Sequence, residues 1–510
     1  MNYYVGLDNG GTTTKAAIFD AKGKEIATAS TATKMLVPQP GFTERDMEEM
    51  WEANCLVIRE ALKKSGAAPA DIRCVAVCGH GKGLYLWGKD GRPAYHGIIS
   101  TDNRAWRYME AWRKDGTEEK AFQLSCQHVL ASQPVALLAW MRDHSPEVLE
   151  NTQWIFECKD YVRFRLTGEP RAELTDYSGA NLVNLHTAQY DPALLALFGL
   201  SDCMEKLPPL CGAAEICGEI TAEKTGLLAG TRVAGGAFDI DACALAVDVV
   251  DEENICMIAG TWSINEYIRP RPVVDGKVMM NSFFCLPGYY LIEECSPTSA
   301  GNNEWFVQNL LPELKAELKK TGGNIYQQMD RWTDSIPVQE QCPIFFPFLM
   351  ASNVHPNAMG SFVGMSNFHT RAHLARSVYE GIAFSHRYHL EKLLATRDQA
   401  PRGIRLAGGV ARSQVWTQMF ADVMKLPVEV VQVNETGALG CAVIGAAASG
   451  EYASLADAAA HMCRISQPIM PDQIRSRLYD EKYELYLQAI QALDPLWDRL
   501  QEYRDRHPQG

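Results

Sequence analysis

The residue best placed to do chemistry is an acid near the middle of the chain. In AGGAFDIDACALAV, residues 234–247, Asp239 follows a glycine pair and precedes an apolar run of helical character. An acid at a helix start is most simply an N-cap. The alternative is catalytic, because a carboxylate can orient an alcohol and take its proton, which raises a rate roughly 10²- to 10⁴-fold. Asp241, two residues later, is the competing candidate, and both stay open at this point.

Two turns rich in glycine and threonine are candidates for phosphate binding. Residues 9–13 read NGGTT, and residues 260–261 read GT. Backbone N–H groups and the hydroxyls of Thr12 and Thr13 can surround an anion, and glycine permits close approach. A plain hairpin turn explains either tip alone, but two such tips favour a clamp on a polyphosphate. No GxxxxGK[ST] segment occurs, so the chain is not a P-loop enzyme.

A candidate metal ligand and a candidate turn for binding adenine complete this part of the pattern. Asp8 ends the apolar stretch YYVGLD, where its carboxylate could hold Mg²⁺ directly or through water. Gly408 and Gly409 separate an apolar stretch from a helix-like one within residues 403–430. A glycine turn at such a junction lets a flat base such as adenine lie against the backbone, although common turn chemistry explains it too.

Two polar loops are candidates for reading a substrate rich in hydroxyl groups. GHGKG, residues 79–83, carries Lys82, and STDNR, residues 100–104, carries Asp102. Both side chains can make directional hydrogen bonds to hydroxyls. Solvated loop charges are the alternative interpretation, and the sequence leaves it open.

These residues need regular elements to position them. The patterns predict strands and helices at the following residues: strands 3–8, 14–20, 72–77, 254–259 and 263–268, and helices 46–64 and 470–505. The strand–turn–strand plan of residues 3–20 recurs at 254–268. This repeat, although faint, indicates two related domains that face each other across a cleft.

Length and composition fit a two-domain enzyme. A chain of 510 residues exceeds one ordinary core, so two domains of about 250 residues are expected. The polar segment DVVDEEN divides them into residues 1–248 and 252–510. With 47% hydrophobic and 22% charged residues, the chain has the balance of a globular enzyme rather than of a disordered protein.

Net charge and cysteine usage limit the possible binding partners of the protein and its cellular compartment. A net charge of -14 without a Lys/Arg cluster argues against nucleic acid. The 15 cysteines are scattered and form no CxxC pair, which favours buried free thiols in a reducing compartment. No signal-peptide pattern and no apolar run of membrane-spanning length occurs. We therefore expect a cytoplasmic protein without a membrane partner.

Taken together, the segments resemble the FGGY family of carbohydrate kinases along most of the chain, from Tyr3 to about Gly450. The matching motifs, in order, are GLDNGGTTTK, CKDYVRFRLTG, TDYSGAN, GGAFD, AGTWS, PTSAGNNEWF, HTRAHLARSVYEGIAFSHR and AGGVARSQVWTQMFADVMKLPV. So many motifs in order are more specific than any one of them. The resemblance implies an α/β fold of the two-domain actin-like ATPase (ribonuclease-H-like) type, with an interdomain active-site cleft that closes over ATP and a sugar.

The resemblance also implies roles for individual residues. It makes residues 1–248 the sugar-binding domain and residues 252–510 the nucleotide-binding domain, with Asp239 as general base and Asp8 as the Mg²⁺ ligand. The residues that match the ATP site are Thr12, Thr13, Lys15, Gly260, Thr261, Gly301, Gly408, Gly409 and Ser413. The residues assigned to the substrate are His80, Gly81, Lys82, Asp102 and Asp239.

Two departures from the family pattern bear on the substrate and on the phosphate hairpin. The usual D-x-G-T reads Asp8–Asn9–Gly10–Gly11, so Thr12 must supply the missing hydroxyl. Where D-xylulose kinases carry Gln-Met-His-Gly, the chain has Lys82 at the histidine position, which argues against D-xylulose. GKGL, ISTDNRA, FDIDA and SPTSAGNNEWF are most similar to the L-xylulose kinase branch. A ketopentose such as L-xylulose is implied, with another ketopentose, a polyol or a keto sugar acid as alternatives.

Two other classes of protein use comparable hairpins. A non-catalytic sugar sensor usually carries a DNA-binding module, and no helix-turn-helix stretch precedes Tyr3. An ATP hydrolase would activate water, whereas the carbohydrate-kinase motifs favour a sugar acceptor. The expected partners are ATP and a small sugar, and a homodimer is left open.

Overall fold

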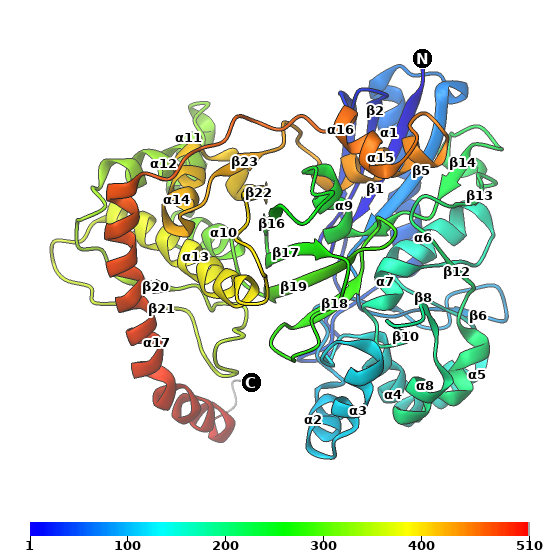
Figure 1. The fold of residues 1–510 in the computed structure, drawn as a ribbon, viewed down its shortest axis with the longest axis horizontal. Coiled ribbons are helices and arrows are strands. Elements are labelled where there is room, and N and C mark those ends of the chain that lie inside the picture. The colour runs from blue at the N-terminus through cyan, green and yellow to red at the C-terminus, as the bar shows by residue number, and fades with distance from the viewer. Residues whose placement is uncertain (508–510) are drawn as a thin grey trace. The chain divides into compact units, whose positions relative to one another are not determined.

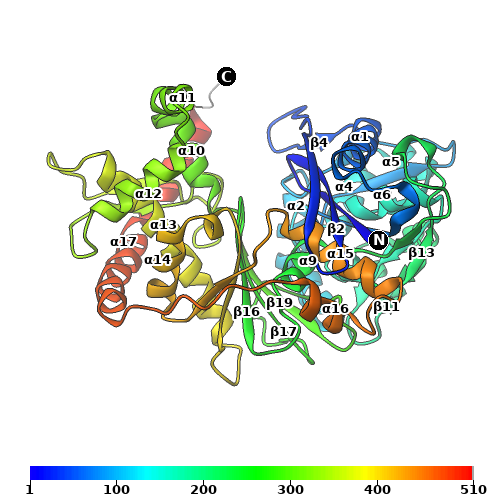
Figure 2. The same ribbon diagram turned by 90° about the horizontal axis from the view of Figure 1, so that it is seen from above.

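The computed structural model describes residues 1–507, which form two compact units (Figures 1 and 2). The first unit comprises residues 1–251, 268–292 and 432–464, and the second comprises residues 252–267, 293–431 and the chain from 465 onward. Neither unit is one continuous stretch of sequence, because late segments return to each.

The first unit is built on a seven-stranded sheet with the order β13-β14-β5-β1-β2-β3, in which β15 also pairs with β5. Its strands are β1 (Tyr3–Asn9), β2 (Thr13–Asp20), β3 (Glu25–Ala32), β5 (Ile72–Gly79), β13 (Ile216–Glu219), β14 (Arg232–Ala234) and β15 (Ala237–Phe238). β1 runs antiparallel to β2 and parallel to β5. Strands β1 and β5 are buried almost throughout, as expected for a sheet covered on both faces.

Helices on the two faces of this sheet explain that burial. α1 (Met47–Ser65) packs on β2 and β3, and α15 (Thr436–Ala448) packs on β1, β5 and α9 (Asp239–Ala246). Figure 2 shows α15, in orange, beside α9 and the blue strands. Close approach requires glycine, because a Cβ on Gly6 would collide with the backbone of Ala438, and one on Gly440 would collide with the backbone of Ala242. The face of β1 that carries Asp8 therefore meets the start of α15.

Shorter elements complete the first unit. They are β4 (Glu44–Arg45), β6 (Tyr85–Gly88), β7 (Gly97–Ile98), α2 (Trp106–Lys114), α3 (Thr117–Ser125), α4 (Pro134–His144), α5 (Pro146–Asn151), β8 (Thr152–Phe156), α6 (Cys158–Thr167), β9 (Ala172–Glu173), α7 (Leu174–Ser178), β10 (Val183–Asn184), β11 (Gln189–Tyr190), α8 (Pro192–Leu197), β12 (Leu210–Cys211), β18 (Met280–Phe283) and α16 (Leu455–Met462). They bury a second apolar cluster, separate from the one beneath α1.

The second unit repeats the hairpin plan. β16 (Asn254–Ala259) runs antiparallel to β17 (Ser263–Arg269) and parallel to β22 (Gly403–Gly408), and β22 pairs with β23 (Val428–Val430). The other elements are β19 (Tyr290–Ser296), α10 (Gly301–Leu310), α11 (Pro312–Lys320), α12 (Ile325–Ser335), β20 (Ile344–Phe346), β21 (Ser361–Val363), α13 (Arg371–Leu394), α14 (Gln414–Met424) and α17 (Gln473–Arg506). In Figure 1 these helices are coloured from green to red.

The elements predicted from the sequence are present. The hairpins expected at residues 3–20 and 254–268 are β1–β2 and β16–β17, and the helices expected at 46–64 and 470–505 are α1 and α17. Within residues 1–507, no helix has both the length and the apolar character needed to cross a bilayer.

Candidate active site

The first hairpin presents an open tip. Asp8 lies opposite Lys15 in the β1–β2 ladder, and the N–H of Gly10 donates to the carbonyl of Thr13 at 3.1 Å. Thr12 is exposed, and no atom lies within 4 Å of the position that a Cβ on Gly11 would take. The tip therefore has the room and the donors that an anionic phosphate requires.

Arg45, on β4, binds the backbone carbonyls of this tip. Its Nη2 donates to the carbonyl oxygens of Gly10 at 3.2 Å and Gly11 at 2.7 Å. The side chain is almost fully buried, and Asn54 steadies the same turn by donating to the Asn9 side chain at 2.8 Å. Because Arg45 engages the carbonyls of Gly10 and Gly11, a ligand at the tip would meet its hydroxyl groups and the N–H groups other than that of Gly10, which bonds to Thr13.

Three charged side chains lie next to the hairpin tip. Lys15 Nζ is 2.7 Å from Glu435 Oε2, which immediately precedes α15. Burial raises the pKa of Asp8; Lys15 opposes this shift and Glu435 adds to it. A Cβ on Gly437 would lie 3.2 Å from Asp8 Oδ2, so glycine keeps the space beside this carboxylate open. A partly buried carboxylate in this setting favours a cation as its partner.

The glycine pair before Asp239 fixes where α9 begins. Gly236 has a φ of 80°, and a Cβ there would collide with the carbonyl of Val77. The N–H of Phe238 donates to Thr175 Oγ1 at 2.8 Å. Phe238 is the N-cap, so Asp239 is the first residue of the helix and not its cap. The simplest interpretation of this acid as an N-cap is therefore wrong.

Burial and neighbouring charges shift the pKa of Asp239. Burial raises its pKa well above the ordinary value, nearby Asp8 and Asp176 raise it further, and Lys82 lowers it. Asp241, the rival candidate, is fully buried, and its Oδ1 accepts a hydrogen bond from the N–H of Cys285 at 3.1 Å. Asp239 remains partly exposed, so of the two acids it is the one that a substrate can reach.

The loop with Lys82 meets the start of α9. A Cβ on Gly81 would lie 2.5 Å from the Phe238 ring and 2.8 Å from Asp176 Oδ1, so only glycine fits. Lys82 has a φ of 63°, and its N–H donates to Glu157 Oε2 at 3.0 Å. Its Nζ lies 5.3 Å from the centroid of the Phe238 ring. Lys82, Phe238 and Asp239 therefore form one group.

His80 and Asp102 lie in buried networks. His80 Nε2 is 2.8 Å from the Tyr85 hydroxyl, and burial together with Arg45 lowers the pKa of His80 to about 3. Asp102 accepts from the N–H of Thr43 at 2.7 Å and from Arg104 through both carboxylate oxygens. Both residues hold the surrounding loops in place, and direct contact with substrate stays a prediction for each.

A buried lysine that pairs with Asp176 was not predicted from the sequence. Lys159 Nζ lies 3.0 Å from Asp160, 3.2 Å from Glu173 and 2.7 Å from Asp176, and all four side chains are essentially inaccessible to solvent. A lysine at this depth must be paired to be tolerated. The only signal in the sequence was its place in CKDYVRFRLTG, next to an acid.

The second unit brings its own predicted residues together. The parallel register pairs Ala259 with Gly408, so the turn after each strand lies at the same edge. Gly408 has a φ of 90°, and a Cβ there would lie 2.5 Å from the carbonyl of Ala259 and 3.0 Å from the Gly260 nitrogen. A Cβ on Gly301 would lie 3.5 Å from Thr261, and Thr261 is exposed. These turns form a second donor-rich edge.

Two further contacts support this edge. Ser413 caps α14 by accepting from the N–H of Trp416 at 3.0 Å, and it donates to Asp330 at 2.7 Å. His386, which sequence reasoning missed, lies 3.0 Å from Ser263 Oγ and 2.8 Å from Ser299 Oγ, and burial lowers its pKa to about 3. Its neutral ring thus ties the strand after the turn at 260–262 to the segment before α10.

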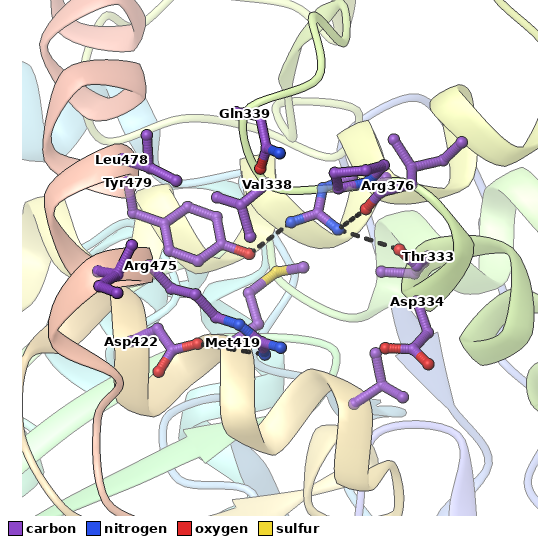
Figure 3. Close-up of a pocket in the computed structure, with 14 residues that line it drawn as sticks. Thr333, Asp334, Val338, Gln339, Arg376, Met419, Asp422, Arg475, Leu478 and Tyr479 are labelled. Atoms are coloured by element: carbon purple, nitrogen blue, oxygen red, sulfur yellow. Dashed lines mark hydrogen bonds and ion pairs between the residues drawn. The ribbon is translucent and has the colours of Figure 1, made fainter.

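Figure 3 shows a cavity of about 260 Å³ in the second unit. It lies among α12, α13, α14 and α17, and Arg376 on its wall donates to the Thr333 carbonyl at 3.0 Å and to the Tyr479 hydroxyl at 2.7 Å. None of the predicted site residues lines it. We therefore assign it no part in the site.

Comparison with known proteins shows the family of the chain. Models of the N-terminal and C-terminal domains of the FGGY family of carbohydrate kinases match residues 3–246 and 255–449. The L-xylulose/3-keto-L-gulonate kinase of Escherichia coli (strain K12) is 36% identical over 98% of the chain and 99% of that protein. A probable L-xylulose kinase of Pasteurella multocida is 34% identical over 97% and 99%.

Solved structures agree at the level of the fold. A ligand-bound xylulose kinase from Lactobacillus acidophilus superposes with a TM-score of 0.87 at 22% identity, covering 98% of the chain and all of that protein. A xylulose kinase from Rhodospirillum rubrum gives 0.84 at 25% identity, with the same coverage.

The fold and its two glycine-rich edges define a two-domain α/β phosphotransferase of the actin-like ATPase type. The chain belongs to the FGGY family of carbohydrate kinases. It is accordingly a kinase that transfers a phosphoryl group to an alcohol of a carbohydrate, and its family uses ATP and a divalent metal ion.

The residues present fit such a metal. Residues 1–507 contain no cluster of three or more His, Cys, Asp or Glu side chains that could hold an ion by themselves. Mg²⁺ does not need one, because it is usually bound by one or two carboxylates together with phosphate oxygens and water. Asp8, beside the open hairpin tip and the space kept by Gly437, suits that role.

Proposed function

We propose that the chain phosphorylates a ketopentose such as L-xylulose, with Asp239 as the general base. The observation that carries this proposal is the grouping of Lys82, Phe238 and Asp239 in the first unit. The names of the two relatives above point to the same substrate class. The group combines an acid that can take a proton, a cation that can bind an oxygen and an apolar ring.

In the proposed reaction Asp239 accepts a hydrogen bond from the substrate hydroxyl and takes its proton as the phosphoryl group is transferred. Its raised pKa makes it a stronger base than an ordinary carboxylate, and Lys82 opposes this shift. Asp8 would hold Mg²⁺, and ATP with this ion supplies the phosphoryl group and neutralises its charge.

The remaining assignments are part of the same proposal. The hairpin donors Thr12 and Thr13, together with Lys15, bind phosphate from the first unit. The turns at Gly260, Thr261, Gly301, Gly408, Gly409 and Ser413 bind the nucleotide from the second unit. His80, Gly81 and Asp102 shape the substrate loop around Lys82.

A keto sugar acid is the second candidate substrate. The Lys82 ammonium favours a carboxylate as well as a hydroxyl, and the Escherichia coli relative is named for 3-keto-L-gulonate as well as L-xylulose. If Lys82 binds that carboxylate, its loss affects the acid more than the neutral sugar.

We also propose that the protein acts in the cytoplasm. Its 15 cysteines are all free thiols, as in a reducing compartment, and the reaction consumes ATP. A homodimer stays an expectation, which light scattering on the purified protein would measure.

The test is a coupled assay of ATP consumption over L-xylulose, D-xylulose, erythritol and 3-keto-L-gulonate. We expect the highest kcat/KM with L-xylulose or the keto acid. Lys82→Met should lower kcat/KM for the keto acid at least about tenfold more than for L-xylulose, because a charge-assisted hydrogen bond is worth about 1.5–3 kcal/mol. Lys89→Met, at an exposed lysine beyond the loop, serves as the control.

Two results would overturn the proposal. A preference for D-xylulose would refute the substrate assignment. ATP turnover that no carbohydrate changes would indicate a hydrolase.

A further inference from the structure

Thr175, on the short helix α7, contacts the residue that precedes Asp239. Its Oγ1 accepts a hydrogen bond from the N–H of Phe238 at 2.8 Å and donates one to Glu173 Oε2 at 2.5 Å. Thr175 is buried, and α7 packs on β15, the two-residue strand that ends at Phe238. Phe238 is the N-cap of α9, and its own side chain makes no capping hydrogen bond. The start of α9 is therefore held by a side chain from another segment of the chain.

The hydroxyl of Thr175 is fixed in one orientation. A threonine hydroxyl has one proton to donate and two lone pairs that accept. The proton goes to Glu173, so a lone pair is left for the N–H of Phe238. Glu173 also accepts from the N–H of Thr175, at 3.1 Å through its other oxygen, and so binds the threonine at two points. Hydrogen bonds that are linked in this way strengthen one another in a protein interior.

An ion pair holds Glu173 in its turn. Lys159 Nζ lies 3.2 Å from Glu173 Oε2, and both side chains are essentially inaccessible to solvent. This oxygen is the same one that accepts the proton of Thr175. A hydrogen bond to a charged group is stronger than one between neutral groups. Lys159, Glu173, Thr175 and the N–H of Phe238 therefore form one continuous chain of contacts that ends next to Asp239.

The ring of Phe238 is fixed as well. A Cβ on Gly81 would come within 2.5 Å of this ring, and Lys82 Nζ lies 5.3 Å from its centroid. The main chain of Phe238 is thus bound to α7, while its ring packs on the loop at residues 79–83. Because Asp239 is the next residue, a shift in the backbone of Phe238 changes the position of the Asp239 carboxylate relative to Lys82.

We propose that Thr175 is a positioning residue for phosphoryl transfer. Its hydroxyl, oriented by Glu173, holds the backbone of Phe238 and so keeps the carboxylate of Asp239 where it can take the proton of the acceptor. This inference rests on the proposed role of Asp239 as general base, and it does not require Thr175 to touch the substrate. The competing explanation is structural, because any buried N–H needs an acceptor.

Two substitutions separate the hydroxyl of Thr175 from the volume of its side chain. Thr175→Val nearly keeps the shape but leaves the N–H of Phe238 without its acceptor, whereas Thr175→Ser keeps the hydroxyl. We expect Thr175→Val to lower kcat about 10- to 100-fold, because small displacements of a catalytic group are costly, and to change KM for the sugar less than about threefold. Thr175→Ser should stay within about threefold of wild type. The coupled assay of ATP consumption, with the best carbohydrate acceptor, measures both.

Thr225 provides a matched control in the same unit. It is buried, and its Oγ1 accepts from the N–H of Leu227 at 3.2 Å and donates to the carbonyl of Ala222 at 2.9 Å. Thr225→Val therefore also removes one donated and one accepted hydrogen bond, but on a segment that packs on α1. We expect it to lower Tm as Thr175→Val does and to leave kcat unchanged.

A double-mutant cycle distinguishes positioning of Asp239 from a structural role. Once Asp239→Asn has removed the base, Thr175→Val has no proton acceptor left to displace. The residual kcat of Asp239→Asn should therefore change less than about threefold when Thr175→Val is added. Equal fold losses in the wild-type and Asp239→Asn backgrounds would show that Thr175 acts through the fold in general, and would overturn the proposal.

Other outcomes also count against Thr175. A normal kcat in Thr175→Val, an effect on KM alone, or an equal loss in Thr175→Ser would each overturn the proposal. If Thr175→Val does not fold, Thr175→Cys takes its place, since a thiol is a weaker hydrogen-bonding group; its kcat should fall below that of Thr175→Ser, and an equal kcat would refute the role of the hydroxyl. Near-normal turnover of Asp239→Asn would instead refute the proposed base itself, so the two failures are distinguishable.

Discussion

Burial and three neighbouring charges set the pKa of Asp239. Burial raises this pKa most, Asp8 and Asp176 raise it further, and Lys82 lowers it. Asp176 is itself paired with Lys159 at 2.7 Å. The pKa of the proposed general base therefore depends on Asp8, Lys82, Asp176 and Lys159, which come from four different segments of the chain.

The dependence of the rate on pH follows from this balance. A general base acts when it is deprotonated, so kcat/KM should rise with pH through the raised pKa of Asp239. Lys82→Met removes the cation that lowers this pKa, and the acidic limb of the profile should therefore move to higher pH. The measurement is kcat/KM for L-xylulose from pH 5 to 9, with Lys89→Met as the control. An acidic limb that stays in place, or moves to lower pH, would contradict the assignment.

Residue types and spacing predicted the candidate acids and the candidate phosphate turns, but not the side chains that contact them. Asp8, Asp239 and Gly408 were predicted because each stands at the end of a recognisable local pattern. Arg45 and His386 were not, because each reaches its turn from a helix or strand that is remote in sequence. Contacts of this kind leave no local pattern.

At the scale of elements, the two-residue strand β4 supports both polar regions of the first unit. Arg45 holds the hairpin tip, and Glu44 receives a hydrogen bond from Arg104 at 2.7 Å, which in turn binds Asp102. One short strand thus connects the predicted phosphate hairpin to the predicted substrate loop. Nothing in the composition of these two residues indicated a strand.

The turn before α9 can be tested with matched glycines. Gly236→Ala should destabilise the fold by about 2–4 kcal/mol and lower kcat, because a Cβ at φ 80° would collide with the carbonyl of Val77. Gly91→Ala, at a φ of 75° in open space, should cost only about 1 kcal/mol and leave kcat unchanged. Urea unfolding and initial rates measure both effects. Equal losses in the two variants would show that backbone strain alone is responsible.

Hydrophobic periodicity predicted the strands and helices well where the pattern was long. The helix expected at residues 46–64 is α1, with Asp46 as N-cap and Gly66 as C-cap. The role of α15 was not predicted, because its small apolar residues give no period that reveals which sheet it covers. Its glycines are explained only by the close backbone contacts with β1 and α9.

At the scale of the whole molecule, each unit is assembled from discontinuous segments. The sequence favoured a single division near residue 250, and the family models follow the same order. In the structure, residues 432–464 pack with the first unit although they lie near the end of the chain. They bring Glu435 to Lys15, so the predicted phosphate hairpin makes an ion pair with a segment near the other end of the sequence.

Each unit also contains a buried neutral histidine, which predicts how stability depends on pH. Burial lowers the pKa values of His80 and His386 from 6.5 to about 3. Between these pH values the unfolded chain binds protons that the folded chain does not, so each histidine lowers the free energy of unfolding as pH falls. The effect approaches about 1.4 kcal/mol per pH unit and per histidine.

Urea unfolding at pH 7.5 and 5.5 checks this prediction. His386→Gln should lose less stability over this interval than wild type, because glutamine keeps the hydrogen bonds but does not titrate. Other titrating groups, including the acids whose pKa values are raised, are present in both proteins and cancel in the comparison. Equal losses in the two proteins would mean that His386 is not buried in its neutral form.

The most direct test of the central claim is the turnover of Asp239→Asn, compared with that of Asp241→Asn. We predict that Asp239→Asn lowers kcat roughly 10²- to 10⁴-fold, while a non-hydrolysable ATP analogue still raises its Tm as it does for wild type. Asp241→Asn should keep near-normal turnover, since its side chain still accepts from the N–H of Cys285. Near-normal turnover of Asp239→Asn, or loss of activity only in Asp241→Asn, would contradict the account.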